Sequence, residues 1–288
     1  MAFGRYTHAI VCRVPNSVKQ CSSGVIGDIN VQLARKEHEE FCKALRSLDL
    51  DVIELPADES TPDCAFVDDT AIICNGAALI CRPANGQRQK EVDTIRATIK
   101  KELEIRVIDI RDPKGIIEGG NVLFTGREFF VGISARTNEA GARALAAAFP
   151  EFPVTPIKLP KRSHLKSLLS MAGPDIICLS ESPEALAVKK QIEREATFQY
   201  QTVTVPDENA TGCLYINGRL LHRQEFPESN QEFAEKIDFD RISLTASELC
   251  KASNGLPSLA LLIRKSQAWK AVAGLASLAL LIRKSRYF

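Results

Sequence analysis

The sequence lacks an excess of charge of either sign. Its 288 residues include 37 Lys and Arg against 36 Asp and Glu, which gives a formal net charge of +1 at pH 7. No molecule-wide field therefore draws the chain to nucleic acid or to an anionic membrane. We expect neither as a partner, and we expect ligands to be recognised by a small local set of residues.

Long apolar runs are also missing. No stretch approaches the roughly 18 consecutive apolar residues that indicate a membrane-spanning helix. Residues 1–8 lack the apolar core of a secretion signal. The sequence therefore predicts a cytosolic protein.

Cysteine is present, but without paired spacing. Nine cysteines are scattered along the chain and none forms a CxxC pair. This distribution predicts reduced thiols, most of them in the core, in place of a disulfide framework or a zinc cluster. The four histidines show no metal-ligand spacing either, so we expect no metal.

Strand-like and helix-like patterns alternate along the chain, and 45% hydrophobic residues are enough for a large core. Two apolar runs within 71–81 flank Asn75-Gly76, a dipeptide typical of a type I′ hairpin. A second hairpin is predicted at 122–131, with its turn at Gly126-Arg127.

Helices are predicted between the hairpins. Apolar residues share one helical face over 90–103, and a run rich in alanine covers 138–148. Further helices are predicted at Ser182, an N-cap followed by proline, and at Ser229, through a capping box. With a strand at 106–110, these patterns predict one α/β domain of repeated hairpin, helix and strand modules.

Five carboxylates lie within residues 58–69, directly before an apolar, strand-like run. Like charges held close raise one another's pKa unless a cation settles among them. A planar guanidinium matches several carboxylates well, so the segment favours an arginine-like ligand. Asp58 and Glu59 are interpreted as a solvated turn, and the candidate ligand-binding acids are Asp63, Asp68 and Asp69.

Other charged residues stand beside turns. Glu118 precedes two glycines at the entrance to a strand, where backbone can approach a ligand closely. His164, in a polar loop, is either a proton-transferring base or a structural histidine. Arg88 and Arg136 could each bind a ligand carboxylate through two N–H groups, or form ordinary ion pairs.

Several segments resemble dimethylarginine dimethylaminohydrolase. They are ELPADESTPDC at 54–64, VLFTGREFFVG at 122–132, and HLKS with SMAGP within 164–174. The similarity runs in order from Thr7 to about Arg264. It implies a five-bladed α/β propeller, which agrees with the repeated modules. It also implies hydrolysis of asymmetric dimethylarginine or monomethylarginine to citrulline and dimethylamine or methylamine, without a cofactor.

The resemblance implies roles for individual residues. Asp63 would hold the guanidinium, Phe66 would pack beside it, and Asp69 with Asp68 would lie in the same pocket. Position 68 carries the shorter acid where relatives often have Glu.

For the remainder of the site, Arg88 and Arg136 match the arginines that hold the amino-acid carboxylate. Glu118 matches an acid that orients His164, and His164 matches the general acid and base.

The nucleophile of the family is a cysteine near the C-terminus, and here that position is Ser258. A hydroxyl needs a base in the transition state, whereas a thiol is readily ionised near neutral pH. Cys250, the nearest upstream thiol, is eight residues away, about 26 Å along an extended chain, and is not expected to substitute.

Ser258 leaves alternatives open. In the first alternative the tail is an alternative or damaged terminus of a true hydrolase. In the second the serine works slowly as the nucleophile, and in the third the chain binds methylarginines without turning them over, as a pseudoenzyme. A further alternative is a deiminase that acts on plain arginine.

The C-terminus contains a repeat. Residues 255–266 return nineteen residues later as 274–285, and the copies differ only at Pro257 and Ala276. Each copy is an apolar strand typical of burial on both faces, and one closed module has a single place for it. We therefore predict one domain over residues 1–266, followed by a surplus C-terminal extension over residues 267–288.

Overall fold

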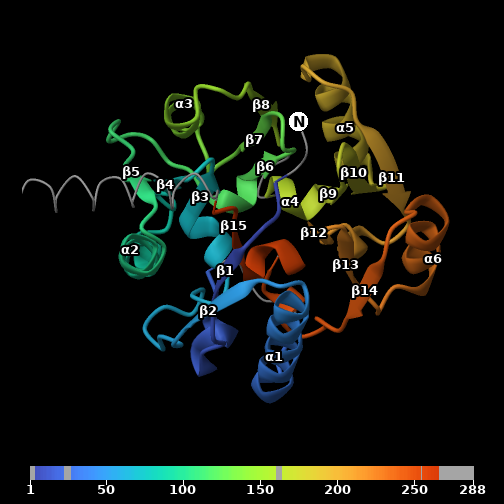
Figure 1. Ribbon diagram of the computed structural model, residues 1–288, viewed down its shortest axis with the longest axis horizontal. Helices are drawn as coiled ribbons and strands as arrows, with labels where there is room; N and C mark the ends of the chain where they lie inside the picture. Colours follow the sequence, from blue (N-terminus) through green and yellow to red (C-terminus); the bar gives the residue numbers. More distant parts are fainter. Residues whose placement is uncertain (1–3, 23–26, 160–163, 254, 266–288) are drawn as a thin grey trace, which may run out of the picture.

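Five small sheets surround a common centre in the computed structural model, which describes residues 4–22, 27–159, 164–253 and 255–265 (Figure 1). Each sheet has three strands, and its middle strand pairs antiparallel with the inner strand and parallel with the outer one. From the inner strand outward the sheets are β15 (Leu261–Ile263), β1 (His8–Cys12) and β2 (Asp51–Leu55); β3 (Ala71–Cys74), β4 (Ala77–Ile80) and β5 (Arg106–Ile108); β6 (Val122–Phe124), β7 (Phe129–Ile133) and β8 (Val154–Lys158); β9 (Leu169–Gly173), β10 (Ile176–Ser180) and β11 (Gln201–Val205); and β12 (Leu214–Ile216), β13 (Arg219–Arg223) and β14 (Arg241–Leu244).

A helix makes the crossover from the middle strand to the outer strand in every sheet, as a parallel connection requires. The predicted five-bladed α/β propeller is therefore confirmed. The crossover helices are α1 (Val31–Ser47), α2 (Gln89–Thr98), α3 (Glu139–Ala148), α5 (Pro183–Glu195) and α6 (Pro227–Lys236), and the short helix α4 (Leu165–Leu168) precedes β9.

The local turn chemistry explains the hairpins. Asn75 and Gly76 both have positive φ, as a type I′ turn demands, and they join β3 to β4 as predicted. The hairpin at 122–131 is also confirmed, with Gly126 at positive φ. Glycine and asparagine adopt this backbone region at little cost, so these turns are fixed by local sequence.

The predicted helices are confirmed with adjusted ends. Over 90–103, α2 continues as a π-helical turn, Ile99–Leu103, and the strand predicted at 106–110 ends at Ile108. Ser182 caps α5 by accepting a hydrogen bond from the N–H of Ala185.

The predicted capping role of Ser229 was wrong. Helix α6 begins at Pro227, with Phe226 at the N-cap, because proline at the first helical position fixes the start. Ser229 is fully buried inside the first turn, and its hydroxyl donates to the carboxylate of Asp207 at 2.7 Å.

Apolar side chains fill the spaces between neighbouring sheets. One cluster joins Ile72 and Leu79 of the β3–β4 hairpin to Phe129 of β7 and Leu145 of α3. Because each helix buries its apolar stripe in this way, the ends of the inner strands and the loops beside them are left to form a site near the axis.

The first sheet combines strands from near the two ends of the described part of the chain. Strand β15 pairs antiparallel with β1, so His8 lies opposite Ile263 and Ile10 lies opposite Leu261. The N–H of Thr7 donates to the carbonyl of Ile263 at 2.9 Å. The first copy of the C-terminal repeat therefore fills the one place available, and the second copy lies outside the described residues.

Ending the chain after Ser266 is expected to leave the fold intact, because closure of the first sheet is complete by Lys265, whose N–H donates to Thr7 Oγ1. The midpoint of thermal unfolding should change by less than about 2 °C. A second truncation, after Ala260, removes β15 and is the control. Its midpoint of thermal unfolding should lie far below that of the 1–266 protein. A loss of more than about 5 °C in the 1–266 protein would contradict the predicted domain boundary.

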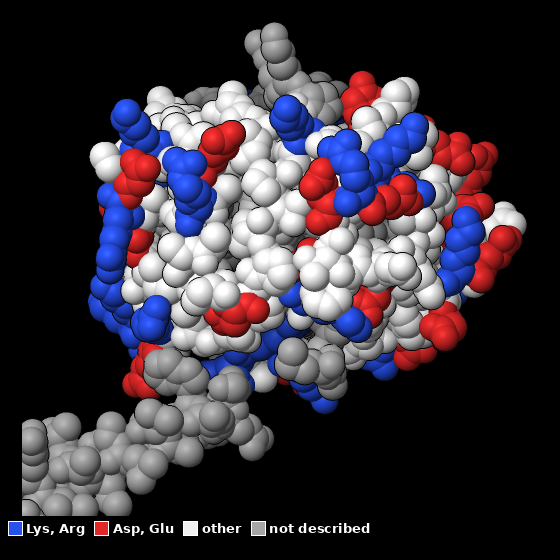
Figure 2. All heavy atoms as spheres, turned by 90° about the horizontal axis from the view of Figure 1, so that it is seen from above, with Lys and Arg blue, Asp and Glu red and all other residues white. Residues whose placement is uncertain are grey.

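Surface charge is mixed in sign. On the face in Figure 2, basic and acidic side chains are interspersed, as expected from the near-zero net charge. In the described part of the chain, no helix has the length and apolarity that crossing a bilayer requires. All nine cysteines are free, and eight of them are buried.

Candidate active site

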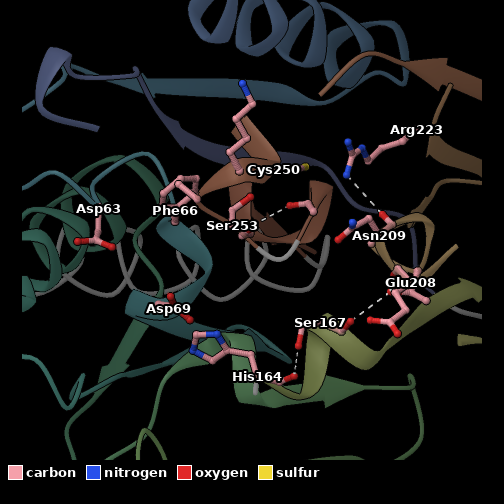
Figure 3. Close-up of a pocket in the computed structure, with 16 residues that line it drawn as sticks. Asp63, Phe66, Asp69, His164, Ser167, Glu208, Asn209, Arg223, Cys250 and Ser253 are labelled. Atoms are coloured by element: carbon pink, nitrogen blue, oxygen red, sulfur yellow. Dashed lines mark hydrogen bonds between the residues drawn. The ribbon is translucent and has the colours of Figure 1, made fainter. Parts of the chain in front are cut away.

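A cavity of about 400 Å³ lies where four chain segments meet (Figure 3). Its lining comes from residues within the segments 63–69, 164–167, 208–212, 250–253 and 255–258, together with Arg223. These segments are the loops and short helices beside the inner strands, so the propeller brings together residues that are far apart in the sequence.

Asp63 and Phe66 line one side of the cavity, and both are buried. The carboxylate of Asp63 accepts hydrogen bonds from the N–H of Ser22, at 3.0 and 3.2 Å. Among the described residues no basic side chain forms a salt bridge with Asp63. Its negative charge is therefore available to a cation in the cavity.

Asp69 lines the same cavity but has a basic partner. Its carboxylate accepts from Arg88 Nη1 at 2.6 Å and from the N–H of Gly120 at 2.8 Å. Burial would raise the pKa of Asp69, but the charges of Arg88 and His164 and these hydrogen bonds outweigh it and lower the pKa to about 2. Asp69 is thus a carboxylate anion across the physiological pH range.

Arg88 lies behind the cavity wall, with only 3% of its side chain exposed. Its Nε donates to Glu91 at 2.9 Å and its Nη2 donates to the carbonyl of Phe66 at 3.1 Å. The sequence predicted that a cationic ligand neutralises the acidic residues of 58–69. Arg88 of the chain itself supplies part of that positive charge.

Asp68 faces away from Asp69. Lys166 Nζ donates to both oxygens of Asp68, at 2.7 and 2.8 Å. Both residues line a separate cavity of about 150 Å³ bounded largely by the inner strands. Burial raises the pKa of Asp68, against the opposing effect of Lys166. The structure thus places Asp68 outside the cavity that contains Asp63 and Asp69.

His164 and Glu118 form a buried pair. His164 Nε2 lies 2.9 Å from Glu118 Oε2, and because a carboxylate accepts, Nε2 carries the hydrogen. The other oxygen of Glu118 accepts from the N–H of Ala84 at 3.1 Å, and Arg136 Nη1 lies 3.4 Å from Oε2. Glu118 and Arg136 do not line the cavity, so both act on it through His164.

The environment of His164 favours its protonated form. Burial alone would lower the pKa of His164, but the hydrogen bond to Glu118 and the charges of Asp69 and Glu118 outweigh burial and raise it. The ring is positioned because His164 is the N-cap residue of α4, whose Leu165 N–H donates to Asn121 Oδ1 at 3.0 Å.

In a proton NMR titration, His164 is therefore expected to titrate above the ordinary histidine pKa. Because the pKa of His164 is higher in the folded state than in the unfolded state, its protonation stabilises the fold. This stabilisation is complete at pH values below the unfolded-state pKa and is lost as pH rises through the folded-state pKa. In Glu118→Gln the pKa should fall below the ordinary value, because burial then dominates. A midpoint that does not move would contradict the pairing. The other histidines serve as internal references with lowered pKa: His8, His38 and His222.

Ser258, which the resemblance places at the nucleophile position, also lines the cavity. Its Oγ donates to the carbonyl of Gly255 at 2.6 Å, so its hydrogen points at backbone and not at a base. Gly255 has φ +102°, and a Cβ there would lie 2.7 Å from Gly212, so the turn that presents Ser258 requires glycine.

Cys250 lies in the same cavity, a placement that the sequence gave no reason to expect. Cys250 belongs to the short 3-10 helix Leu249–Lys251 and Ser258 to the short 3-10 helix Leu256–Leu259, and both helices contribute to the lining of the cavity. Burial raises the pKa of Cys250 to about 11, so it is a neutral thiol. Figure 3 shows it on the side of Arg223, away from His164.

Within the described residues, one group of side chains could hold a metal ion. The ligand atoms of Asp69, Glu118 and His164 all lie within 4.8 Å of one another. The two carboxylates already accept hydrogen bonds from Arg88, Gly120, Ala84 and His164. The same arrangement therefore suits proton transfer through His164 as well as it suits metal binding. The expectation of no metal stays a prediction.

Comparison with known proteins gives a consistent result. A family model for eukaryotic N,N dimethylarginine dimethylhydrolase matches residues 14–213. A protein of Bos taurus named "Putative hydrolase DDAH2" is 34% identical over 272 residues, covering 90% of this chain and 95% of that protein. N(G),N(G)-dimethylarginine dimethylaminohydrolase of Pseudomonas aeruginosa is 27% identical over 258 residues, covering 88% and 98%.

Solved structures agree with the sequence matches. A cysteine-to-serine mutant of the Pseudomonas aeruginosa enzyme, complexed with citrulline, superposes with a TM-score of 0.78 at 26% identity. It covers 90% of this chain and 100% of that one. The cavity, its buried acids and the His164–Glu118 pair thus lie in a fold shared with that enzyme. This chain belongs to the dimethylarginine dimethylaminohydrolase family, whose members are amidine hydrolases that act on methylated arginine.

Proposed function

We propose that this chain binds asymmetric dimethylarginine or monomethylarginine in the cavity, with the guanidinium between Asp63 and Asp69. The observation that carries the proposal is one cavity lined by two buried carboxylates and by a buried imidazole that a third carboxylate holds. Anions bind the flat cation, and the imidazole supplies and removes protons beside it. We propose that the protein acts in the cytosol on this free small molecule.

The reaction would use Ser258 as the nucleophile. Ser258 Oγ attacks the guanidinium carbon and gives its proton to neutral His164 as the C–O bond forms; the C–N bond then breaks, and His164 passes that proton to the departing dimethylamine or methylamine. Water next attacks the same carbon and gives a proton to His164, the C–O bond breaks as His164 returns that proton to Ser258 Oγ, and citrulline is released after its remaining extra proton passes to solvent. Glu118 holds the imidazole in place through both steps.

Roles for four further residues remain predictions. Phe66 lines the cavity, so packing against the guanidinium is open to it. Arg88 is already bonded to Asp69 and Glu91, so its available role is to hold Asp69 in place. Arg136 contacts Glu118, so the contact with a ligand carboxylate that the resemblance implies for Arg136 stays a prediction. Asp68 contacts Lys166, so the contact with the guanidinium that the resemblance implies for Asp68 stays a prediction too.

Binding without turnover is the second candidate function. The hydroxyl of Ser258 donates to the carbonyl of Gly255, so the ground state offers no hydrogen bond from Ser258 to His164. A hydroxyl without a base is a poor nucleophile, and a guanidinium is a poor electrophile. The third candidate, a deiminase, would use the same cavity with plain arginine.

Calorimetry with asymmetric dimethylarginine tests the binding. The wild-type chain should release heat on binding, and Asp63→Asn should bind about 10- to 100-fold more weakly, because a buried charge-assisted contact is lost. Absence of heat with arginine and with both methylated forms would remove both the hydrolase and the binding-protein proposals. Comparing citrulline released from arginine and from dimethylarginine separates the deiminase from the other two.

A further inference from the structure

A second cavity, of about 600 Å³, lies outside the candidate active site and shares none of its lining residues. It is bounded by one face of α1, by β2 and by the chain that follows β1 (Figure 1). Its volume falls in the usual range of small-molecule sites. Basic side chains outnumber acidic ones in its lining, with Arg13, Arg35, Lys43 and Arg46 against Glu39 and Glu54.

Arg35 is held at the wall of this cavity by neutral groups. Its Nε donates to the carbonyl of Val14 at 3.1 Å, and its Nη2 donates to Asn16 Oδ1 at 3.0 Å. In the described part of the chain Arg35 forms no salt bridge, and the nearby acid Glu54 is bonded to other arginines. The guanidinium is therefore fixed in position and keeps its full charge for an anion.

The two other arginines of the cavity share one carboxylate. Glu54 accepts from Nη2 of Arg46 and, at 3.4 Å, from Nε of Arg13. The contact with Arg13 is longer than the usual 2.7–2.9 Å, and 68% of the Arg13 side chain is exposed. One carboxylate cannot neutralise two guanidiniums, so both arginines keep N–H groups for a further acceptor.

His38 gives independent evidence for a ligand. It lines the cavity and is only 4% exposed. Its Nδ1 lies 3.7 Å from Sγ of Cys42, one turn further along α1. Its Nε2 is buried and has no hydrogen-bond partner among the described residues. Buried polar atoms are ordinarily paired, and an unpaired one destabilises the fold, so a missing partner for Nε2 needs an explanation.

The contact with Cys42 decides which ring nitrogen of His38 carries the hydrogen. Burial raises the pKa of Cys42 to about 12, so the thiol keeps its proton and donates it to Nδ1. Burial lowers the pKa of His38 to about 4, so at neutral pH the ring carries one hydrogen, on Nε2. An anion in the cavity is the acceptor that this Nε2–H lacks.

We propose that this cavity binds a phosphate group, free or on a small ester, between the guanidiniums of Arg13, Arg35 and Arg46, with His38 Nε2–H donating to it. The excess of two positive charges in the lining matches the charge of about −1.5 to −2 that a phosphate monoester carries at pH 7. Guanidinium forks fit phosphate oxygens. The site is independent of the proposed function, because it uses no residue of the other cavity.

Calorimetry at pH 7 with inorganic phosphate, adenosine monophosphate and adenosine tests the inference. The wild-type chain should bind a phosphate and should not bind adenosine. Arg13→Gln and His38→Leu should each weaken that binding by about 10- to 100-fold, because each removes a hydrogen bond to a charged group. Lys36→Gln removes the same charge from an exposed position of α1 outside the cavity, and it should leave binding within about twofold.

The two phosphates distinguish the sources of the group. Tighter binding of adenosine monophosphate than of inorganic phosphate would support an ester, and the reverse would support the free anion. Absence of heat with both phosphates would overturn the inference. Equal heat in the wild type, Arg13→Gln and His38→Leu would overturn it too, since binding would then lie elsewhere.

Thermal unfolding separates a binding role of His38 from a structural one. Without phosphate, His38→Leu should unfold at the same temperature as the wild type or higher, because an unpaired buried atom is removed. Phosphate should raise the midpoint more in the wild type and Lys36→Gln than in His38→Leu and Arg13→Gln. An equal rise in all four proteins would contradict the site. If His38→Leu does not fold by circular dichroism, Arg13→Gln, at an exposed side chain, decides the question.

Discussion

Replacing Ser258 by cysteine is expected to raise the rate of citrulline formation from asymmetric dimethylarginine by at least about 10³-fold, since losing a nucleophile costs hydrolases up to about 10⁶-fold. Ser258 already lines the cavity that contains Asp63, Asp69 and His164. Only the attacking atom would change. A sulfur is larger and more nucleophilic than a hydroxyl oxygen, and its proton leaves near neutral pH.

The charges of the cavity bear on the thiol in the variant. His164, whose pKa is raised, is largely imidazolium at mildly acid pH and would stabilise a thiolate. Asp69 remains anionic beside it and opposes that effect, until a guanidinium neutralises the carboxylates. The thiolate is therefore expected to form mainly with the substrate bound, and a fluorescent alkylating agent should react faster when substrate is present.

Two controls make the result decisive. Ser258→Ala should release no more citrulline than the wild type, and Ser258→Cys with His164→Gln should lose about 10²- to 10⁴-fold relative to Ser258→Cys alone. If folded Ser258→Cys binds dimethylarginine and still yields no citrulline, the hydrolase proposal fails. Binding without turnover is then the function that stands.

Replacing Arg88 by methionine is expected to lower the free energy of unfolding by about 3–5 kcal/mol, because it leaves buried carboxylates without their counter-ion. Arg88 bonds Asp69 at 2.6 Å and Glu91 at 2.8 Å, and the side chains on both sides of these pairs are almost fully buried. For a chain of this size the loss corresponds to a fall of roughly 6–20 °C in the midpoint of thermal unfolding.

The cost of the Arg88→Met change should depend on pH. Asp69 has a folded-state pKa of about 2, below the ordinary value near 3.9, so its contribution is present above pH 4 or so and is lost as pH falls through 2. Without Arg88 the pKa of Asp69 should rise, because burial then dominates. The difference between wild type and variant should therefore shrink as the solution is made acid.

Glu91 works in the opposite direction. Burial raises its pKa to about 7, against the attraction of Arg88 and with the repulsion of Asp63 and Asp69 added. A carboxyl with a raised folded-state pKa favours the fold at low pH, and that contribution falls as pH rises from the ordinary value through 7. The charge of Arg88 thus keeps Asp69 fully ionised, but it only partly offsets the rise in the pKa of Glu91 that burial causes.

An exposed ion pair provides the control for Arg88→Met. Arg194 contacts Glu195 with most of its side chain in solvent, so Arg194→Met should change the unfolding midpoint too little to measure. Urea unfolding at pH 7 and pH 4 would give both free energies. A loss below about 1 kcal/mol in Arg88→Met would show that the buried carboxylates find other partners.

Local sequence was enough to predict two hairpins and several helices, whereas the five-bladed propeller was expected from the family resemblance. The Asn75-Gly76 turn, the Ser182 cap and the periodicity of 90–103 depend on residues close along the chain, so their geometry follows from backbone preference and side-chain pattern. The Ser229 cap failed because Pro227, two residues earlier, fixed the helix start.

The sequence by itself determined which chemical groups are present. They are an acidic segment directly before a buried strand, a histidine in a loop, and a serine where the family has a cysteine. The tertiary structure decided which way each one faces. Adjacent Asp68 and Asp69 point into different cavities, because successive residues of a tight helical turn project in different directions. Arg88 pairs with acids behind the wall, while Arg223 and Cys250 enter the cavity from another sheet and its loops. Such contacts depend on how five sheets pack around an axis, which no spacing along the chain encodes.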